Sequence, residues 1–319
     1  DYYNTNTSNM LLYVPVPLLT GYSTSLQNLG KVNNRGWELA LTSQHTFANG
    51  FGYSFNANYA KNTNEVKELG PGNAPIISSG SVAHAYYITE VGKPIGNYYL
   101  LVQDGIFATE EDLKKYPHFD NTEVGDFRFV DVDGDDKLDL DKDRTICGNY
   151  MPKFTYGFGG KLWYAGFDMD FNFQGVYGNK ILNLNKRYLD NMEGNTNGTK
   201  IALDRWKSPE NPGSGSVNKA NRKQTGYNSR TSTWHLESGS YLRLQNLSLG
   251  YTLPRALTQK FKVEKMRVYV SGQNLFTITN YSGYNPEVNA RPSKNLTPGE
   301  DYGTYPLART YMFGLNLTL

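Results

Sequence analysis

The chain of 319 residues has one cysteine, Cys147, and no long uninterrupted apolar run. A single cysteine excludes a disulfide scaffold and a zinc site built from several cysteines. Without about 18 consecutive apolar residues, the chain has no candidate transmembrane helix. It also lacks an excess of charge of one sign, because 32 Lys and Arg stand against 30 Asp and Glu. Nucleic-acid-binding proteins normally carry a concentrated basic excess, so we expect no nucleic acid among its partners.

Aromatic and polar residues are what the chain has in abundance. It holds 25 Tyr, 15 Phe and 4 Trp, whereas the hydrophobic fraction is only 38%. The mean hydropathy of −0.59 is low for a core of this size. A polar, glycine-rich and tyrosine-rich chain of this length is typical of a secreted β protein or of a transmembrane β-barrel.

Several segments alternate between large apolar residues and polar or small ones, which is the period of a β-strand. Every odd position from Phe167 to Phe173 is apolar and every even position from Asp168 to Gln174 is polar. In a soluble sandwich the apolar face would cover a packed core. In an outer-membrane barrel it would meet lipid, and the polar face would line the lumen. One strand does not distinguish these architectures.

The lengths of the connections do distinguish them. Short turns are expected at 48–50 and 164–166, and a medium connection follows Leu253. Long connections alternate with these shorter ones, which places all the long loops at one end of the sheet, as in barrels with short periplasmic turns and long extracellular loops. A soluble sandwich rarely has such long connections without a separate domain. The long extracellular loops are predicted at about 14–35, 63–152, 178–238 and 278–307.

We therefore predict an all-β fold, a transmembrane antiparallel up-and-down β-barrel. A closed barrel of eight strands has room inside only for side chains. Charged residues packed there would be buried without evident partners, so the eight strands are expected to form an arc of a wider barrel. The residues expected on the lumen face are Asp168, Asp170, Asn172, Gln174, Arg243 and Gln245. The strands are expected at 2–13, 36–47, 51–62, 153–163, 167–177, 239–252, 266–277 and 308–319.

Seven segments, spread over most of the chain and in the family's order, resemble the SusC-like (RagA-type) TonB-dependent outer-membrane transporters. The segments are LLYVPVP (11–17), LQNLGKVNNRGWELAL (26–41), VGKPIGNYY (91–99), VDVDGDDKLDLDKDRTICGN (130–149), KFTYGFGGKLWYAGFDMDFNFQGVYGNKI (153–181), GSYLRLQNLSLGYTLP (239–254) and RVYVSGQNLFTITNYSGYNPEV (267–288).

The resemblance implies a plugged barrel of about 22 strands in the outer membrane of a Gram-negative bacterium. Residues 1–319 would form its carboxyl-terminal part, and the N-terminal region that meets the TonB complex is not among them. The resemblance also implies a SusD-like lipoprotein lid on the extracellular loops. The implied function is import of oligomeric nutrient, with oligosaccharide as the first cargo class and oligopeptide as the second. Two alternatives stay open, a passive outer-membrane porin and a secreted adhesive β protein.

One loop carries residues suited to metal coordination. Carboxylates at positions 1, 3, 5 and 9 of an EF-hand-like spacing, with a backbone carbonyl at position 7, suit Ca²⁺ because it prefers hard oxygen ligands. Crowded carboxylates also repel one another unless a cation lies between them. The residues in this spacing are Asp131, Asp133, Asp135, Lys137 and Asp139.

The loop departs from the EF-hand pattern at two positions. Asp136 stands where the sharp turn favours Gly, and Lys142 occupies the twelfth position, where an acid is expected. The resemblance implies a different spacing, in which Asp143 is the closing ligand. We predict that Ca²⁺ binds in the loop at 131–143 and stiffens it. A solvated acidic turn, balanced by neighbouring Lys and Arg, is the alternative.

The aromatic residues form two groups. Those in the predicted strands, such as Tyr156 and Tyr177, fit an interfacial girdle, where an amphipathic ring is stable at headgroup depth. Those in the loops could stack on sugar rings or on peptide side chains, or could fix the loops in place. The candidate substrate-binding residues are Tyr98, Tyr99, Trp206, Trp234 and Tyr284.

No catalytic constellation stands out, so we expect no enzyme activity. The four histidines are scattered without partners at metal-ligand spacing, and no G-x-S-x-G nucleophile elbow is present. Asp168 and Asp170 share a strand face, but paired-carboxylate catalysis needs one group kept protonated and one ionised. A hydrated barrel wall offers no apolar pocket that would separate their pKa values.

Overall fold

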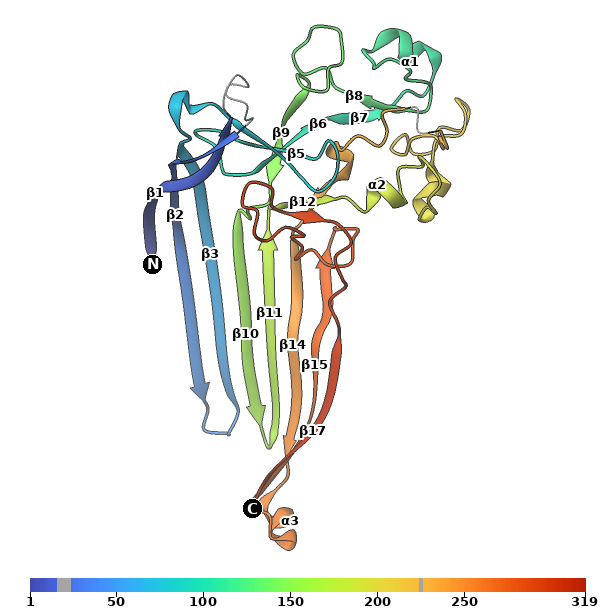
Figure 1. The fold of residues 1–319 in the computed structure, drawn as a ribbon. Coiled ribbons are helices and arrows are strands. Elements are labelled where there is room, and N and C mark those ends of the chain that lie inside the picture. The colour runs from blue at the N-terminus through green and yellow to red at the C-terminus, as the bar shows by residue number, and fades with distance from the viewer. Residues whose placement is uncertain (16–23, 224–225) are drawn as a thin grey trace.

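The computed structural model of this protein describes residues 1–15, 24–223 and 226–319. Its main element is one antiparallel sheet of eight long strands (Figure 1). The strands are, in spatial order, β1 (Tyr2–Pro15), β2 (Thr24–Thr46), β3 (Gly52–Glu68), β10 (Phe154–Tyr164), β11 (Phe167–Tyr177), β14 (Tyr241–Thr252), β15 (Lys265–Thr279) and β17 (Thr310–Thr318). No ladder joins β1 to β17 within the described ranges, so the predicted arc is confirmed.

The predicted bounds are wrong at the first three strands. β1 continues to Pro15, β2 begins at Thr24 and β3 continues to Glu68. Most of the predicted loop 14–35 is therefore strand, and the predicted loop 63–152 begins too early. The remainder of the first loop, residues 16–23, lies outside the described residues.

Asparagine side chains explain why apolar alternation does not predict these extensions of β1, β2 and β3. The amide of Asn33 donates to Asn4 Oδ1 at 2.6 Å and to Asn6 Oδ1 at 3.0 Å, across the β1–β2 ladder. The amide of Asn64 donates to Asn34 Oδ1 at 2.9 Å across the β2–β3 ladder. Polar side chains thus bridge the strands where no apolar face marks them.

The connections at the lower end of the sheet are short (Figure 1). Residues 47–51 join β2 to β3, and Ala165 and Gly166 alone join β10 to β11. Both residues of this two-residue turn have positive φ, 47° and 88°, as in the type I′ turns of tight hairpins. The third lower connection contains α3 (Arg255–Thr258) and η5 (Gln259–Phe261).

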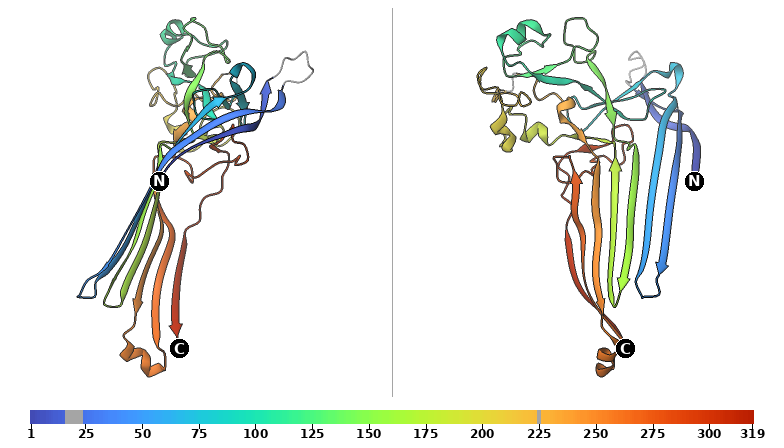
Figure 2. Two further views of the ribbon diagram at one scale, coloured as in Figure 1. Left: turned by 90° about the vertical axis from the view of Figure 1, so that its left-hand side faces the viewer. Right: turned by 180° about the vertical axis from the view of Figure 1, so that it is seen from behind.

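The long connections fold together as a lobe at the upper end (Figures 1 and 2). In the part of the chain that the structure describes, the lobe consists of three small sheets and several short helices. One sheet contains β4 (Ile76–Ser79), β5 (Tyr86–Thr89), β6 (Asn97–Leu101) and β9 (Arg144–Asn149). The second pairs β7 (Gln103–Ile106) with β8 (Phe127–Phe129), and the third contains β13 (Leu236–Ser238), β12 (Lys180–Asn183) and β16 (Glu300–Asp301). The helices are η2 (Pro71–Asn73), α1 (Glu110–Lys115), α2 (Lys186–Leu189), η3 (Lys200–Asp204) and η4 (Thr233–His235).

Most of the buried apolar residues lie in the lobe and not between the long strands. The largest fully buried side chains include Tyr87, Tyr98 and Phe127. On the long strands, Phe167 is 64% exposed and Phe313 is 86% exposed. An apolar sheet face this open to solvent is unstable in water but stable against lipid. Among the described residues, no helix is long and apolar enough to cross a membrane.

Candidate functional site

The register of the long strands divides the arc into two faces. One, the apolar face, holds cross-strand pairs such as Phe158 with Phe173 and Val270 with Phe313. The other, the polar face, holds Lys161 opposite Asp170 and Gln174 opposite Arg243. The structure therefore places the predicted lumen-facing residues together on one side of the wall. The sixth of them, Gln245, lies at a bulge in β14 and hydrogen-bonds to Gln174.

An Asp–Arg pair joins β11 to β15 on the polar face. Arg267 donates from Nε to Asp168 Oδ1 at 2.9 Å and from Nη2 to Oδ2 at 2.6 Å. The two bonds engage both carboxylate oxygens, which is the bidentate geometry that makes such pairs strong and directional. Asp168 is therefore a structural partner of Arg267.

A second polar cluster holds the loop after β15 against the top of the wall. Arg243 is 2% exposed. Its Nε donates to Thr277 Oγ1 at 2.9 Å, its Nη2 donates to Asn285 Oδ1 at 2.8 Å, and its Nη1 pairs with Glu287. A buried guanidinium needs such a complete set of acceptors, because an unpaired buried charge is costly.

Sequence reasoning missed four members of these clusters, and one of them, Thr277, is the cross-strand neighbour of Arg243 in β15. Arg267 lies at a polar position of an alternating strand, so the alternation that identified Arg243 could have found it. Asn285 and Glu287 lie in an irregular loop, where no periodicity marks them. Their role depends on contact with Arg243, which is 42 and 44 residues away in the chain.

Glu300 joins two of the long connections within the lobe. It is fully buried, and its carboxylate accepts from the Tyr87 hydroxyl at 3.0 Å and from the Ser81 backbone N–H at 3.1 Å. Beside it, Tyr281 donates to Asp301 Oδ2 at 2.5 Å. Since β16, which contains both acids, also pairs with β12, three long connections converge at this point.

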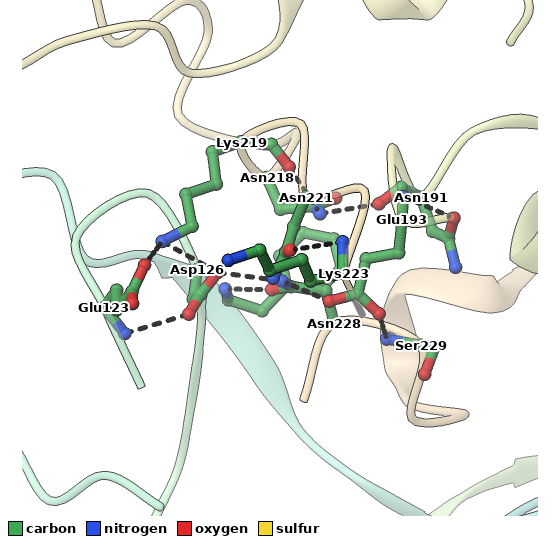
Figure 3. A network of polar contacts seen from close by, with 11 residues as sticks. Glu123, Asp126, Asn191, Glu193, Asn218, Lys219, Asn221, Lys223, Asn228 and Ser229 are labelled. Atoms are coloured by element: carbon green, nitrogen blue, oxygen red, sulfur yellow. Dashed lines mark hydrogen bonds and ion pairs between the residues drawn. The ribbon is translucent and has the colours of Figure 1, made fainter. Parts of the chain in front are cut away.

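A network of buried carboxylates and amides joins the outer part of the lobe (Figure 3). Asn228 Nδ2 donates to Asp126 Oδ1 at 2.8 Å and to Glu193 Oε1 at 2.9 Å. Lys219 Nζ contacts Asp126 at 3.6 Å and Glu123 at 2.6 Å. Burial raises the pKa of Glu193 above its usual range. The network fixes Glu193, Lys219 and Asn228 against the segment at 123–126.

The five predicted substrate-binding residues do not form one site. Tyr98 is fully buried and donates its hydroxyl to two backbone carbonyls, so it cannot meet a ligand in this arrangement. Trp206 and Trp234 pack against the apolar cluster around Phe127, and Tyr99 lies near the Arg144 guanidinium. Only Tyr284 is widely open to solvent, with 81% of its surface exposed. Substrate contact stays a prediction for Tyr284, and also for Tyr99, Trp206 and Trp234, which are partly exposed.

The acidic loop brings three of the predicted ligands together. Carboxylate oxygens of Asp131, Asp133 and Asp143 lie within 4.8 Å of one another. Asp136 has a positive φ of 61°, so it makes the sharp turn at which the spacing favours Gly. The other predicted ligands lie outside this group: Asp135 accepts from the Lys137 backbone N–H at 3.0 Å, and Asp139 from that of Asp141 at 2.6 Å.

The electrostatics of the loop agree with crowded negative charge. Desolvation, and then the charges of Asp135, Asp143 and Asp131, raise the pKa of Asp133. Hydrogen bonds from the backbone N–H groups of Asp141 and Lys142 lower the pKa of Asp139. The three converging carboxylates supply the hard oxygen donors that Ca²⁺ takes, so the residues present fit such an ion.

Taken together, these features define a class of protein. A wall of long antiparallel strands, apolar on one face and polar on the other, with short turns at one end and a large loop lobe at the other, is a segment of a membrane-spanning β-barrel.

Comparison with known proteins then shows which proteins the chain is similar to. The chain is 34% identical over 329 residues to TonB-dependent receptor P3 of Formosa agariphila, covering 99% of this chain and 32% of that receptor. It is 26% identical to TonB-dependent receptor SusC of Bacteroides thetaiotaomicron, covering 99% of this chain and 29% of SusC. No protein-family model matches the chain.

The fold agrees with this kinship. The structure of the RagAB peptide transporter matches with a TM-score of 0.76 and 26% identity, over 99% of this chain and 32% of that one. The family resemblance is thereby confirmed: this chain is a homologue of the TonB-dependent receptors that include SusC, and it has the fold of their barrel. It spans about a third of the length of the relatives it matches.

Proposed function

We propose that this chain is the carboxyl-terminal part of the barrel of an outer-membrane, TonB-dependent nutrient importer. The observation that carries the proposal is the wall itself, with a polar face suited to a hydrated lumen behind an apolar face suited to lipid. The kinship with TonB-dependent receptors supports it. In this role the chain does no covalent chemistry, and its relatives are named as receptors and transporters, not enzymes.

The proposed cargo is an oligomeric nutrient, with oligosaccharide as the first class and oligopeptide as the second. The polar face offers both donors and acceptors, among them Gln174, Gln245 and Asn172, and such groups suit sugar hydroxyls and peptide amides alike. The similar RagAB structure is described as a peptide transporter, which supports the second class.

The proposed partners act at opposite ends of the wall. A SusD-like surface lipoprotein covers the lobe and captures cargo, and the TonB complex acts through the N-terminal region of the whole protein. The shape of the lobe supports a docking role. Its members are fixed to one another by Glu300 and by the network around Asn228 (Figure 3), so it offers a preformed surface.

Uptake by cells that carry the whole transporter tests this function. Labelled oligosaccharides and oligopeptides of the same length are supplied to wild-type cells, to cells without the transporter and to cells without TonB. We expect one cargo class to accumulate only when both the transporter and TonB are present. Equal uptake without TonB would indicate a passive porin, and no uptake of either class would overturn the import proposal.

We also propose that Ca²⁺ binds between Asp131, Asp133 and Asp143 and stiffens the loop at 131–143. The ion would relieve the mutual repulsion that raises the pKa of Asp133. Its role would be structural: by joining the three carboxylates it would hold the loop in one conformation.

A further inference from the structure

A groove lies where the long strands enter the lobe, between the upper part of β3 and the residues just before β10. Its volume is about 490 Å³, and its lining includes Lys61 of β3, Lys153 immediately before β10 and Lys180 of β12. Lys61 is opposite Trp37 in the β2–β3 ladder, so its side chain starts on the apolar face and not in the lumen.

Aromatic rings lie directly below the groove on the same face. The Phe154 ring lies 4.9 Å from the Tyr177 ring and 5.4 Å from the Tyr59 ring, measured between centroids. Tyr59 is two residues before Lys61, and Phe154 follows Lys153. Amphipathic rings on the lipid face of a barrel mark the depth of the headgroups. The three lysines therefore lie at or just beyond headgroup depth.

Two glycines leave room for the aliphatic parts of Lys153 and Lys180. A Cβ at Gly178 would lie 2.6 Å from Lys153 Cγ, and a Cβ at Gly148 would lie 3.3 Å from Lys180 Cγ. Both glycines have positive φ, 87° and 109°, which disfavours any larger residue there. The stems thus lie on backbone that carries no side chain.

The three ammonium groups are the charged groups that line the groove. Over residues 1–15, 24–223 and 226–319, none of the three makes an ion pair or a side-chain hydrogen bond. The amides in the lining are engaged, since Asn64 bonds to Asn34 and to the Ile95 N–H, and Asn149 bonds to Asn97. The groove therefore favours an anion over a neutral sugar.

A neighbouring hollow extends the positive charge along the same level. It has a volume of about 340 Å³, shares Lys61 with the groove and adds Arg35, beside Tyr2 and Trp37. Both cations of this hollow, Arg35 and Lys61, share its lining with the aromatic rings of Tyr2 and Trp37. Such a band of cations above rings complements a ligand that has acyl chains below and phosphate above.

We propose that this groove, Lys61–Lys153–Lys180, binds the phosphate group of a glycolipid in the outer leaflet of the membrane that surrounds the barrel. The ammonium groups contact the phosphate, and the acyl chains lie along the aromatic layer and the apolar face below it. The inference rests on the proposed outer-membrane location, with the lobe on the outside, but not on any particular cargo.

The test uses the whole transporter purified in detergent, with bound lipid measured by native mass spectrometry. The variant is K61Q/K153Q/K180Q, and the matched control is K114Q/K200Q/K294Q, which removes three exposed lysines elsewhere. The probes are bis-phosphorylated lipid A, the same lipid after removal of its phosphates, and inorganic phosphate. A heat-resistant folded band on a gel confirms that each variant retains its barrel.

We expect wild type and control to bind phosphorylated lipid A equally, and the groove variant to bind it about a hundredfold more weakly. Each lysine near an anionic headgroup contributes about fivefold. Equal binding by the groove variant would overturn the proposal. So would equal binding of the dephosphorylated lipid, or occupation of the groove by inorganic phosphate alone. Cargo uptake by the same variants separates failure of this inference from failure of the import function.

Discussion

Tyr98 and Tyr284 are the same residue type in the same lobe, yet their surroundings are opposite. Tyr98 is fully buried and its hydroxyl lies 3.0 Å from the carbonyl oxygens of Lys180 and Gly299. Tyr284 is 81% exposed. At the residue scale, burial separates a side chain that fixes the lobe from one that is free to meet a partner.

Replacement of Tyr98 by Phe tests this distinction. The ring keeps its packing, but the two buried carbonyl oxygens lose a donor, which costs about 1–3 kcal/mol. We expect Y98F to increase proteolysis and hydrogen exchange in the lobe while the strand wall is unchanged. Y284F, the matched control, should leave both measurements as in wild type. An unchanged lobe in Y98F would contradict the structural role.

His235 makes the stability of the lobe depend on pH. Burial, and then the charges of Lys186 and Arg187, lower the pKa of His235 to about 3 from its ordinary 6.5. The neutral ring therefore contributes stability that is fully present above pH 6.5 and is lost as the pH falls toward 3, at about 1.4 kcal/mol per pH unit.

Hydrogen exchange of residues 231–238 at pH 7 and pH 5 measures this effect. In wild type we expect the protection of these amides to decrease as the pH is lowered. In H235Q the decrease should be less steep, because one titrating group is missing. His84, whose pKa burial lowers to about 4, is present in both proteins and keeps its own contribution. Identical pH slopes in the two proteins would exclude His235 as the titrating group.

At the scale of elements, the hairpin between β10 and β11 carries a small strain. Ala165 adopts a φ of 47°, a region that side chains with a Cβ rarely occupy and that Asn and Gly tolerate better. We expect A165N to raise the free energy of unfolding of the barrel by about 1 kcal/mol. G166A should lower it, because Gly166 has a φ of 88°. Urea unfolding of the whole transporter gives both values, and a destabilised A165N would contradict the turn geometry.

In our proposal, Ca²⁺ holds the acidic loop at 131–143 in an ordered conformation. We expect Ca²⁺ to protect residues 130–144 from protease, and a chelator to remove that protection. D133N should abolish the difference because it removes one of the three converging carboxylates. D120N, at an exposed acid elsewhere in the lobe, is the control. Equal protection with and without Ca²⁺ would contradict the proposal and favour the alternative, a solvated acidic turn.

The elements differ in how far the sequence predicts them. Strict alternation locates β11 and β17, because each residue there faces lipid or lumen. The start of β2 escapes prediction because its side chains pair through asparagine amides and show no apolar period. The burial of Tyr98 escapes it for another reason: its partner Gly299 lies 201 residues away in the chain, and no local pattern reports such a contact.

At the scale of the whole molecule, no ladder within residues 1–15, 24–223 and 226–319 joins β1 to β17, and the polar face of the arc is lined by charges that suit water. Both facts agree with a segment of a larger barrel, as does a match to about a third of each relative's length. In the proposed function, the lobe lies outside the membrane, the wall crosses it and the groove of lysines lies at its outer boundary.

Peptide-mapping mass spectrometry of the detergent-purified particle that contains this chain tests the central claim most directly. We predict peptides from an upstream plug domain in the same polypeptide, together with a co-purifying surface lipoprotein. A folded particle made only of these 319 residues, without a partner, would contradict the account, because the open arc would then have to close as a small barrel on its own.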